Sequence, residues 1–183
     1  MRYIKTIFIF LFFTVSSCKF GGDVCLIPME IVMVSGGGLH TLILGRDGTV
    51  WATGYNYNGQ LGTGNYTNRN VFTKVASNVK MIAAGDNHSL ILKEDGSVLT
   101  TGYNDHGQLG TGEFGAGADR NLFTKVASGV KMIAVGGNHS LVLKEDGIVL
   151  VTGWNDWGQL GNGSTGGSIN VFTKIDNKTF SCE

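Results

Sequence analysis

The chain has 183 residues, with 14 Lys+Arg against 14 Asp+Glu, so its formal net charge is zero. This balance argues against a basic protein that holds nucleic acid through its phosphates, and we expect no nucleic-acid partner. The 29 glycines beside a single proline exclude collagen and proline-rich linkers, and they favour many short strands joined by tight turns.

The first residues have the layout of a secretory signal peptide, with Arg2 and Lys5 ahead of an apolar run at 7–15. This run is too short to span a bilayer, which takes about 20 residues. The residues Val-Ser-Ser-Cys at 15–18 resemble a bacterial lipobox. The resemblance implies cleavage after a 1–17 signal peptide and acyl chains on Cys18. We therefore expect a protein secreted across the inner membrane and held in the cell envelope by its lipid alone, with the outer membrane or cell surface favoured over the cytoplasm. The competing interpretation is an ordinary signal peptide in which Cys18 has no role.

The rest of the chain is an internal repeat. Residues 79–112 and 130–163 agree at 26 of 34 positions, and residues 31–64 match the first of these copies at 19 of 34. Each copy closes with a Phe-Thr-Lys strand, at 71–75, 122–126 and 171–175. The repeats predict six segments along the chain: the signal peptide 1–17, a lipidated linker 18–30, repeats 31–78, 79–129 and 130–175, and a tail 176–183.

One copy reads as four strands. In the middle copy we expect strands at 80–84, 88–93, 98–103 and 123–126, with a two-residue Asp-Gly hairpin joining the second to the third. Leu90, Ile91 and Leu92 run together without strict alternation, which indicates a strand covered on both faces. No stretch after Cys18 has a convincing helical period with caps, so the expected fold is all-β.

The middle copy also carries a recognisable pattern. Residues 85–112 read G-x-x-H-S-L-x-L-x-x-D-G-x-V-x-x-x-G-x-N-x-x-G-Q-L-G-x-G, with close copies at 37–64 and 136–163. This pattern resembles the RCC1 (regulator of chromosome condensation) repeat. The resemblance implies a partial β-propeller of about three four-stranded antiparallel blades, whereas complete members carry about seven. The chain departs from the family in its three repeats, in its lipoprotein-like signal, and in lacking an insertion like the wedge through which the founding member acts on its GTPase. Guanine-nucleotide exchange is therefore only a weak alternative.

The repeated polar residues have structural interpretations. Equivalent histidines on successive blades would not converge on a metal, so we expect each to hydrogen-bond the backbone of its own blade. The repeated aspartates precede glycine and indicate hairpin turns rather than calcium ligands or acid catalysts. The glycines that follow the third strand are expected to be needed for backbone geometry. These structural residues are His40, His88, His139, Asp47, Asp95, Asp146, Gly54, Gly102 and Gly153.

No catalytic pattern stands out. There is no Gly-x-Ser-x-Gly elbow, no recognisable cysteine nucleophile motif and no carboxylate pair at a repeated spacing. We therefore expect neither an enzyme nor a bound cofactor or metal.

The copies differ most in the loops after the third strand, where the surface is free to specialise. Four residues there have the amphipathic character of contact anchors: Tyr57, Tyr66, His106 and Trp157. The simplest competing explanation is drift in exposed loops. We expect a module that binds a protein partner. The alternatives are a glycan or cell-wall binder that uses the same aromatic residues, and a truncated propeller without a function of its own.

Three blades of a larger ring leave two unpaired faces, which we expect to be apolar and exposed. Two chains joined head to tail would cover both faces in a closed C2 ring, so a homodimer is one hypothesis and an open monomeric arc is the other. Cys25 precedes the first repeat and Cys182 follows the third. In an open arc they lie too far apart for an intramolecular disulfide, but in the ring Cys25 of one chain would approach Cys182 of the other.

Overall fold

The computed structural model describes residues 30–175, in which all regular structure is β-strand. The strands form three four-stranded antiparallel sheets, which confirms the expected all-β fold of about three blades. Cys18, Cys25 and Cys182 lie outside the described residues. Within 30–175 the chain has no helix of the length and apolarity needed to cross a membrane.

Each sheet, or blade, is one sequence repeat whose strands pair with their neighbours in chain order. Blade 1 comprises β1 (Ile31–Gly36), β2 (His40–Gly45), β3 (Val50–Gly54) and β4 (Arg69–Ala76). Blade 2 comprises β5 (Val79–Ala84), β6 (His88–Lys93), β7 (Val98–Gly102) and β8 (Arg120–Ala127). Blade 3 comprises β9 (Val130–Val135), β10 (His139–Lys144), β11 (Val149–Trp154) and β12 (Ser168–Lys174).

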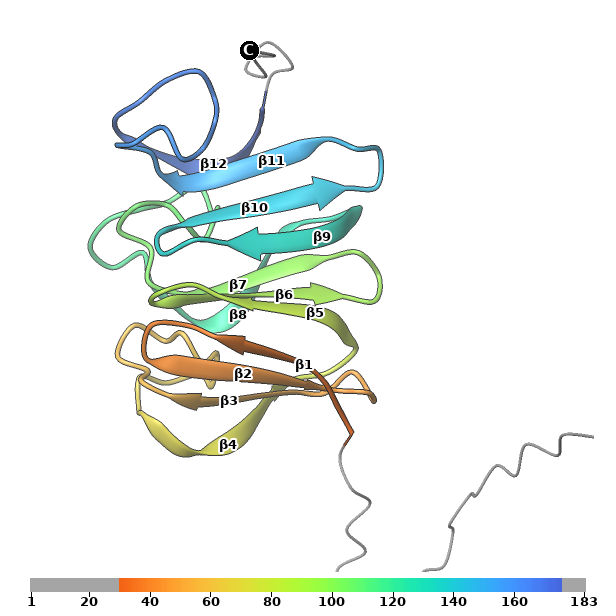
Figure 1. Ribbon diagram of the computed structural model, residues 1–183. Helices are drawn as coiled ribbons and strands as arrows, with labels where there is room; N and C mark the ends of the chain where they lie inside the picture. Colours follow the sequence, from red (N-terminus) through yellow and green to blue (C-terminus); the bar gives the residue numbers. More distant parts are fainter. Residues whose placement is uncertain (1–29, 176–183) are drawn as a thin grey trace, which may run out of the picture.

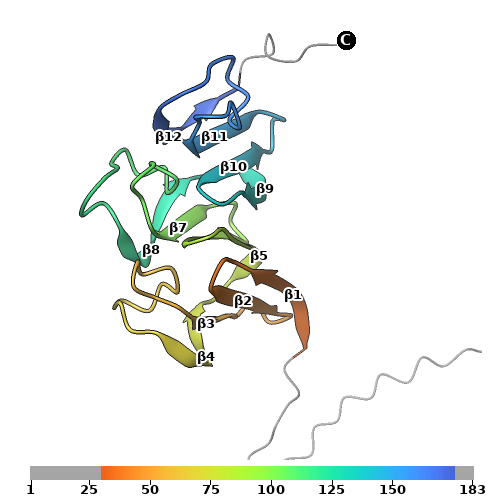
Figure 2. The same ribbon diagram turned by 60° about the vertical axis from the view of Figure 1, so that its left-hand side comes forward.

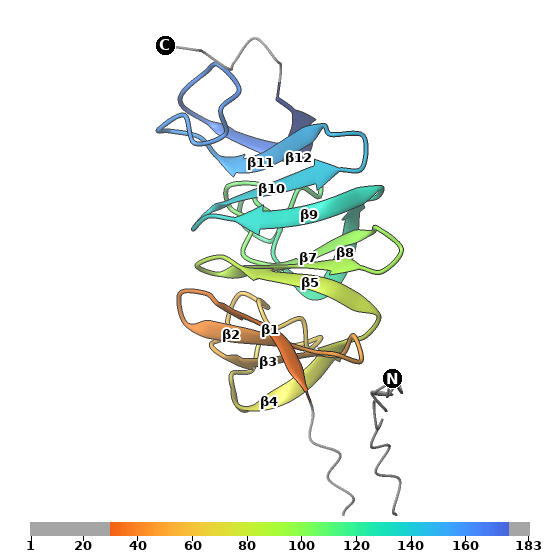
Figure 3. The ribbon, with the colours of Figure 1, turned by 45° about the vertical axis from the view of Figure 1, so that its right-hand side comes forward.

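The three blades stack face to face in chain order (Figure 1). A turned view places the first strands β1, β5 and β9 along one side of the stack and the last strands β4, β8 and β12 along the other (Figure 2). A third view shows the hairpins between second and third strands lined up along one edge of the stack (Figure 3). Equivalent positions of successive blades therefore lie beside one another, which places the repeated residues in rows.

The hairpin between the second and third strands differs in one detail from the sequence prediction. In blade 2 the main-chain N–H of Lys93 donates to the carbonyl of Ser97 at 2.8 Å, and that of Gly96 donates to the carbonyl of Lys93 at 3.0 Å. The loop is therefore three residues long, with Gly96 at φ 79° in the left-handed position, rather than a two-residue turn. The extra residue allows Asp95 to keep an ordinary negative φ and to use its side chain as a brace.

The core lies between blades. Leu90, Leu92 and Val98 of blade 2 cluster with Ile133 and Val142 of blade 3, and the matching residues of blade 1 cluster with blade 2 in the same way. The other face of β6 also packs inward, since Ile91 is 1% exposed in the cluster shared with blade 1. The prediction that the strand at 88–93 is covered on both faces is confirmed. Burial of this kind stabilises a protein by about 25 cal/mol for each Å² of apolar area, so the joints between blades supply most of the hydrophobic stabilisation.

Candidate interaction surface

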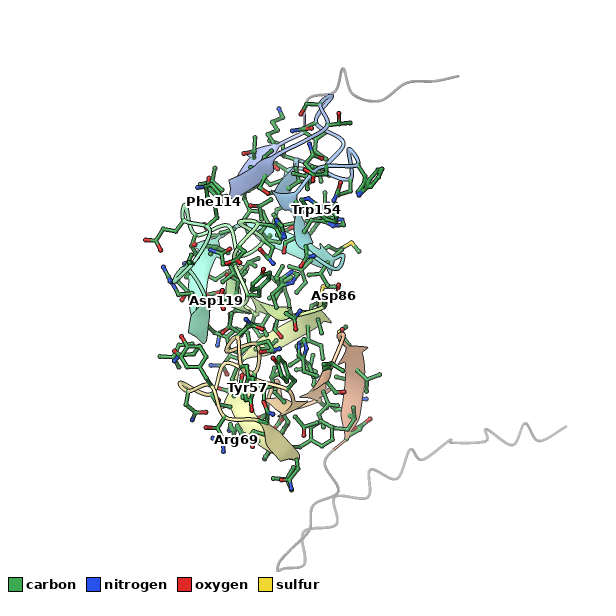
Figure 4. The ribbon with its side chains drawn as sticks, turned by 90° about the vertical axis from the view of Figure 1, so that its left-hand side faces the viewer. Tyr57, Arg69, Asp86, Phe114, Asp119 and Trp154 are labelled. Atoms are coloured by element: carbon green, nitrogen blue, oxygen red, sulfur yellow. The ribbon has the colours of Figure 1, made fainter. Side chains whose placement is uncertain are left out.

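One edge of the stack gathers the long loops. The loops after β3, β7 and β11 span residues 55–68, 103–119 and 155–167. The turns between first and second strands end at the same edge, because the strands are antiparallel and His40 pairs with Gly54 in the register of β2 and β3. We call this edge the loop face. Figure 4 looks onto it and labels residues from all three blades, including Tyr57, Asp119 and Trp154.

A buried asparagine holds each loop in place. In blade 2, Asn104 is fully buried, and its Oδ1 accepts the main-chain N–H of Leu109 at 3.0 Å. Its Nδ2 donates to the hydroxyl of Thr111 at 3.2 Å and to the carbonyl of Glu113 at 2.8 Å. Asn56 and Asn155 make the same set of contacts in blades 1 and 3. Each loop is therefore held by a buried side-chain amide whose donors and acceptor all have hydrogen-bond partners.

A glutamine fixes the residues next to it. The Oε1 of Gln108 accepts the main-chain N–H of His106 at 3.0 Å, and the Gln108 side chain is fully buried. Gln60 and Gln159 accept from Asn58 and Trp157 in the same way. The residue that precedes the glutamine by two positions is therefore held at the main chain while its side chain is left free to vary. Those are the positions at which the near-identical copies differ.

The repeated histidines bridge blades. Nε2 of His40 lies 2.8 Å from the hydroxyl of Ser89, and Nε2 of His88 lies 3.0 Å from that of Ser140, in each case on the next blade. The expectation that each histidine bonds the backbone of its own blade was wrong, because the ring reaches across the joint. The Ser140 hydroxyl donates to the main-chain carbonyl of Gln108 at 2.7 Å, so it must accept from His88, and the network assigns the proton to Nε2.

These imidazoles are held neutral. Burial lowers the pKa of His40 from its ordinary 6.5 to about 4. Burial, helped by the neighbouring imidazoles of His40 and His139, lowers the pKa of His88 to about 3. Nδ1 of His40 and of His88 is buried without a hydrogen-bond partner among the described residues, so a second proton would gain nothing there. His40 and His88 therefore bridge successive blades as neutral imidazoles.

The four predicted anchors all lie on the loop face, but they do not form one cluster. Trp157 is 81% exposed, Tyr57 is 64% exposed and Tyr66 is 48% exposed. His106 lies between two rings, with centroids 6.2 Å from Tyr103 of its own blade and 5.6 Å from Trp154 of the next. Tyr57 packs against Tyr55, with ring centroids 4.9 Å apart. The surface is therefore a row of aromatic side chains that runs across the three blades.

The loop face is acidic. Its loops and turns carry no lysine, and the only arginines near it are those that begin β4 and β8. Its carboxylates are Asp86, Asp105, Glu113, Asp119 and Asp156. Five carboxylates against two arginines leave a formal charge of −3. All seven lysines within residues 30–175 lie toward the opposite edge, beside the Asp-Gly hairpins.

Two of these carboxylates are also built into the loops. Asp119 accepts the main-chain N–H of Asn104 at 2.8 Å and the side-chain amide of Asn58 from blade 1 at 3.1 Å. Asp105 accepts the hydroxyl of Tyr103 at 2.9 Å. Partial burial, together with this hydrogen bond, raises the pKa of Tyr103. The charges of Asp105 and Asp119 are therefore held in position by hydrogen bonds.

The family-model comparison agrees with this geometry. The model of the regulator of chromosome condensation (RCC1) repeat matches residues 31–60, 79–108 and 130–159, and a second model of the same repeat matches 47–92 and 95–143. Together the matches cover more than half of the chain. The chain belongs to the RCC1-repeat family. Each matched stretch of the first model begins at the first residue of β1, β5 or β9 and covers the first three strands of one blade. The stretches of the second model begin in the hairpin between the second and third strands and continue into the next blade.

Solved RCC1-type structures share the fold. Human WBSCR16 is 27% identical, with a TM-score of 0.72 over 82% of this chain and 39% of that chain. Yeast RCC1 (Prp20), solved bound to Kap60, is 26% identical, with a TM-score of 0.71 over 82% of this chain and 38% of that one. A second structure of Prp20p from Saccharomyces cerevisiae is also 26% identical, with a TM-score of 0.70 over 82% and 40%. This chain therefore spans about two fifths of the length of these relatives.

The remaining repeated residues of this RCC1-repeat chain have structural contacts. Oδ1 of Asp95 accepts the main-chain N–H of Ser97 at 2.8 Å, and this bond lowers the pKa of Asp95. Asp47 and Asp146 brace their hairpins in the same way. Gly102 has φ 109°, and a Cβ there would lie 2.5 Å from the carbonyl oxygen of Asn87. Gly54 and Gly153 have the same geometry, so a side chain is excluded at all three positions.

Within residues 30–175 no group of three His, Cys, Asp or Glu side chains is placed to hold a metal ion. Sequence reasoning did not single out the buried asparagines and glutamines, nor the inter-blade serines. Their signal was present, because the asparagine and glutamine are identical in all three copies and the serine in two.

Proposed function

We propose that this chain is a non-catalytic RCC1-repeat module that binds a protein partner through its loop face. The observation that carries the proposal is the row of exposed aromatic side chains on main-chain positions fixed by buried amides. Preorganised aromatic residues lose little conformational entropy when a partner covers them, and for that reason they dominate protein interfaces. Trp157 and Tyr57, as exposed rings on held turns, are the anchors of this surface.

The charge of the loop face selects the chemistry of the partner. Five carboxylates on the same face as exposed aromatic rings favour a segment that carries Lys or Arg, because such a cation gains both Coulombic attraction and contact with a ring face. Support by analogy comes from the yeast relative, which was crystallised with Kap60 and was studied for its binding to Gsp1p and histones. Those partners are properties of the yeast protein.

We also propose that the module acts at a bacterial cell envelope, anchored by lipid on Cys18. The support is the Val-Ser-Ser-Cys sequence at 15–18 after an apolar run, which lies outside the described residues. An anchor of more than one acyl chain gives stable membrane attachment, whereas a single chain is marginal. The loop face would then be presented to other envelope proteins.

The test is affinity capture from an envelope protein extract with the full chain as bait. We expect the wild type to retain a defined protein, and Trp157→Ala combined with Tyr57→Ala to lose it. The matched control is Lys93→Ala combined with Lys144→Ala on the opposite edge, which should capture as well as the wild type. Retention by the wild type should fall as salt is raised, since the charge attraction is screened.

A parallel binding assay with purified peptidoglycan and a glycan array addresses the alternative. Retention on either, abolished by the same aromatic substitutions, would show a glycan-binding module instead. Equal capture by the loop-face variant and the wild type would place the interaction elsewhere on the molecule and overturn the proposal.

A further inference from the structure

The joint between successive blades is a repeated interface with defined parts. The first part is apolar. Leu90 and Leu92 of blade 2 pack on Ile133 of blade 3, and the same positions of blade 1 pack on Ile82 of blade 2. Ile82 is 5% exposed and Ile133 is 6% exposed, so this position is closed to solvent wherever a preceding blade is present.

The second part is a ring seated on a glycine. In the first joint, the ring of Phe123 occupies the place where a Cβ of Gly62 would stand. In the second joint, a Cβ of Gly110 would lie 2.6 Å from the ring of Phe172. The glycine belongs to the Gln-Leu-Gly segment of one blade and the phenylalanine to the last strand of the next. The fit therefore sets the direction of stacking, because the glycine always lies on the preceding blade and the phenylalanine on the next one.

The third part is polar. Each joint has the histidine-to-serine bridge described above, with the serine hydroxyl donating to a glutamine carbonyl of the preceding blade. Main-chain bonds add to it, since the N–H of Val79 donates to the carbonyl of Gly48 at 3.0 Å, and that of Val130 to Gly96 at 3.1 Å. A joint therefore has two halves. The leading half is the set of leucines, glycine and histidine on the preceding blade. The following half is the isoleucine, phenylalanine and serine on the next blade.

Blade 3 carries a leading half that no other blade of the described residues covers. Leu141, Leu143 and Val149, which match the buried leucines and valine of the other blades, line an open apolar hollow of about 190 Å³. Around Gly161, which matches Gly62 and Gly110, no described atom lies within 4 Å of a Cβ position. Among residues 30–175, His139 has no counterpart of the serine that His40 and His88 bridge to.

Blade 1 carries the complementary following half, also uncovered. Val34, which matches Ile82 and Ile133, is 69% exposed. Phe72, which matches Phe123 and Phe172, is 44% exposed. Thr41 occupies the position of Ser89 and Ser140, whose hydroxyls accept a hydrogen bond from the histidine of the preceding blade. Blade 1 therefore keeps the hydroxyl that the bridge needs. Every part of the joint is thus present in one chain, with its halves at opposite ends of the stack (Figure 1).

We propose that blade 3 binds blade 1 of a second copy of this chain through the same joint that connects the blades within the chain. Phe72 of the second copy seats on Gly161, its Val34 enters the hollow beside Leu141, and its Thr41 hydroxyl accepts from His139. A second copy is the occupant because the chain supplies both halves, so two copies placed head to tail satisfy two joints at once. That arrangement is a dimer around a two-fold axis.

The self-association is measured by light scattering and sedimentation velocity on the full chain between 1 and 50 μM, concentrations chosen as roughly those where interfaces of this kind form. We expect twice the mass of one chain. Val34→Lys should give monomer, with the dissociation constant raised by roughly a hundredfold or more, because a charge would be buried in an apolar hollow. The matched control is Val32→Lys on the same strand, whose counterparts in the other blades are Lys80 and Lys131, and it should remain a dimer.

Complementation separates this joint from non-specific association. Leu143→Lys disables the leading half as Val34→Lys disables the following half. Each variant alone should be monomeric, and a 1:1 mixture should form a heterodimer through the one intact pair of faces. Circular dichroism and thermal melting of each variant establish that it is folded, since Val34 is exposed within a single chain.

The polar bridge has its own test. Thr41→Val removes the bridge from both joints, so it should weaken the dimer by about a hundredfold, about tenfold for each lost hydrogen bond, whereas Thr41→Ser should keep it. A wild-type chain that stays monomeric up to 50 μM overturns the proposal, as does dimerisation that Val34→Lys and Val32→Lys affect equally. Because Val34 lies in β1 and not in the loops of the loop face, capture of a partner by monomeric Val34→Lys leaves the proposed function standing.

Discussion

Nε2 of His88 lies 3.0 Å from the hydroxyl of Ser140, and this contact connects blade 2 to blade 3 through a neutral imidazole. The same contact joins His40 to Ser89 one blade earlier. In both cases the serine hydroxyl donates a hydrogen bond to the main-chain carbonyl of a glutamine at 2.7 Å. The cohesion of the stack therefore includes a polar chain as well as apolar packing, and this polar chain responds to pH.

The first prediction is a loss of stability in mild acid. The native pKa of His88 is about 3, whereas the unfolded chain protonates near 6.5, so unfolding takes up a proton between these values. Stability is therefore complete above pH 6.5 and falls as the pH is lowered toward 3. Each pH unit costs about 1.4 kcal/mol for a fully linked group. Urea unfolding at pH 7.5 and 5 should show the fall. His88→Gln should reduce the fall without abolishing it, because the lowered pKa of His40 links that group to stability over the same range. The variant should also be less stable at pH 7.5.

The second prediction concerns Ser140→Ala. The change leaves both the imidazole N–H of His88 and the carbonyl of Gln108 buried without a partner, and each orphaned group costs about 1–3 kcal/mol. We expect the free energy of unfolding to fall by about 2–4 kcal/mol. Ser168→Ala, at an exposed position of β12, is the matched control and should change stability by less than about 0.5 kcal/mol. Equal effects of the two substitutions would contradict the bridge.

The third prediction separates close packing from backbone strain at glycine. Gly102 and Gly115 both have positive φ, at 109° and 89°, but only Gly102 has a backbone oxygen 2.5 Å from the Cβ position. Gly115→Ala should cost about 1–2 kcal/mol, the strain of a positive φ alone. Gly102→Ala should cost clearly more, and Gly102→Val more still. Thermal melts of the three variants decide the ranking, and a reversed order would show that the interpretation of Gly102 is wrong.

The fourth prediction is that the exposed anchors do not support the fold. Trp157 is 81% exposed, and its contact with the loop is through its main-chain N–H, which Gln159 accepts at 3.0 Å. Trp157→Ala keeps that bond, so its melting curve should match that of the wild type within about 0.5 kcal/mol. His106→Ala should likewise leave the fold intact. If Trp157→Ala were less stable than Gly102→Ala, Trp157 would be a structural residue and not an exposed anchor.

The fifth prediction concerns the lipid anchor. In bacterial cells, metabolic labelling with a fatty acid should mark the wild-type protein and should place it in the membrane fraction. Cys18→Ala should abolish the label and release the protein, whereas Cys25→Ala should change neither. An unlabelled, released wild-type protein would reject the lipobox interpretation.

The strands and blades could be predicted from the sequence because the same pattern occurs in three copies. The repeat period gave the blades, and the uninterrupted Leu90-Ile91-Leu92 run indicated a strand packed on both sides, which burial confirms. The expected second strand at 88–93 coincides with β6. The fourth strand of blade 2, β8, begins at Arg120, three residues earlier than expected. Its main chain still pairs with β7 on the N-terminal side of its apolar side chains, where Arg120 pairs with Gly102.

What the sequence could not show is which atoms meet across a joint. His88 and Ser140 are 52 residues apart, and nothing local indicates that the ring reaches the next blade. The hairpin at Asp95-Gly96 shows the same limit on a small scale, since two- and three-residue loops share that dipeptide and only the hydrogen bond from Lys93 to Ser97 distinguishes them. The candidate interaction surface was predicted where the copies diverge, and its acidic character depends on which strand ends lie together.

The buried asparagines have a consequence for how such a surface can change. Asn56, Asn104 and Asn155 make the same main-chain contact in all three loops, although the residues one and two positions after them differ from blade to blade. Tyr57-Asn58, Asp105-His106 and Asp156-Trp157 are the three pairs already present in one chain. A combinatorial library at these six positions should therefore yield mostly folded proteins with different binding properties, which makes the loop face a scaffold for selected recognition.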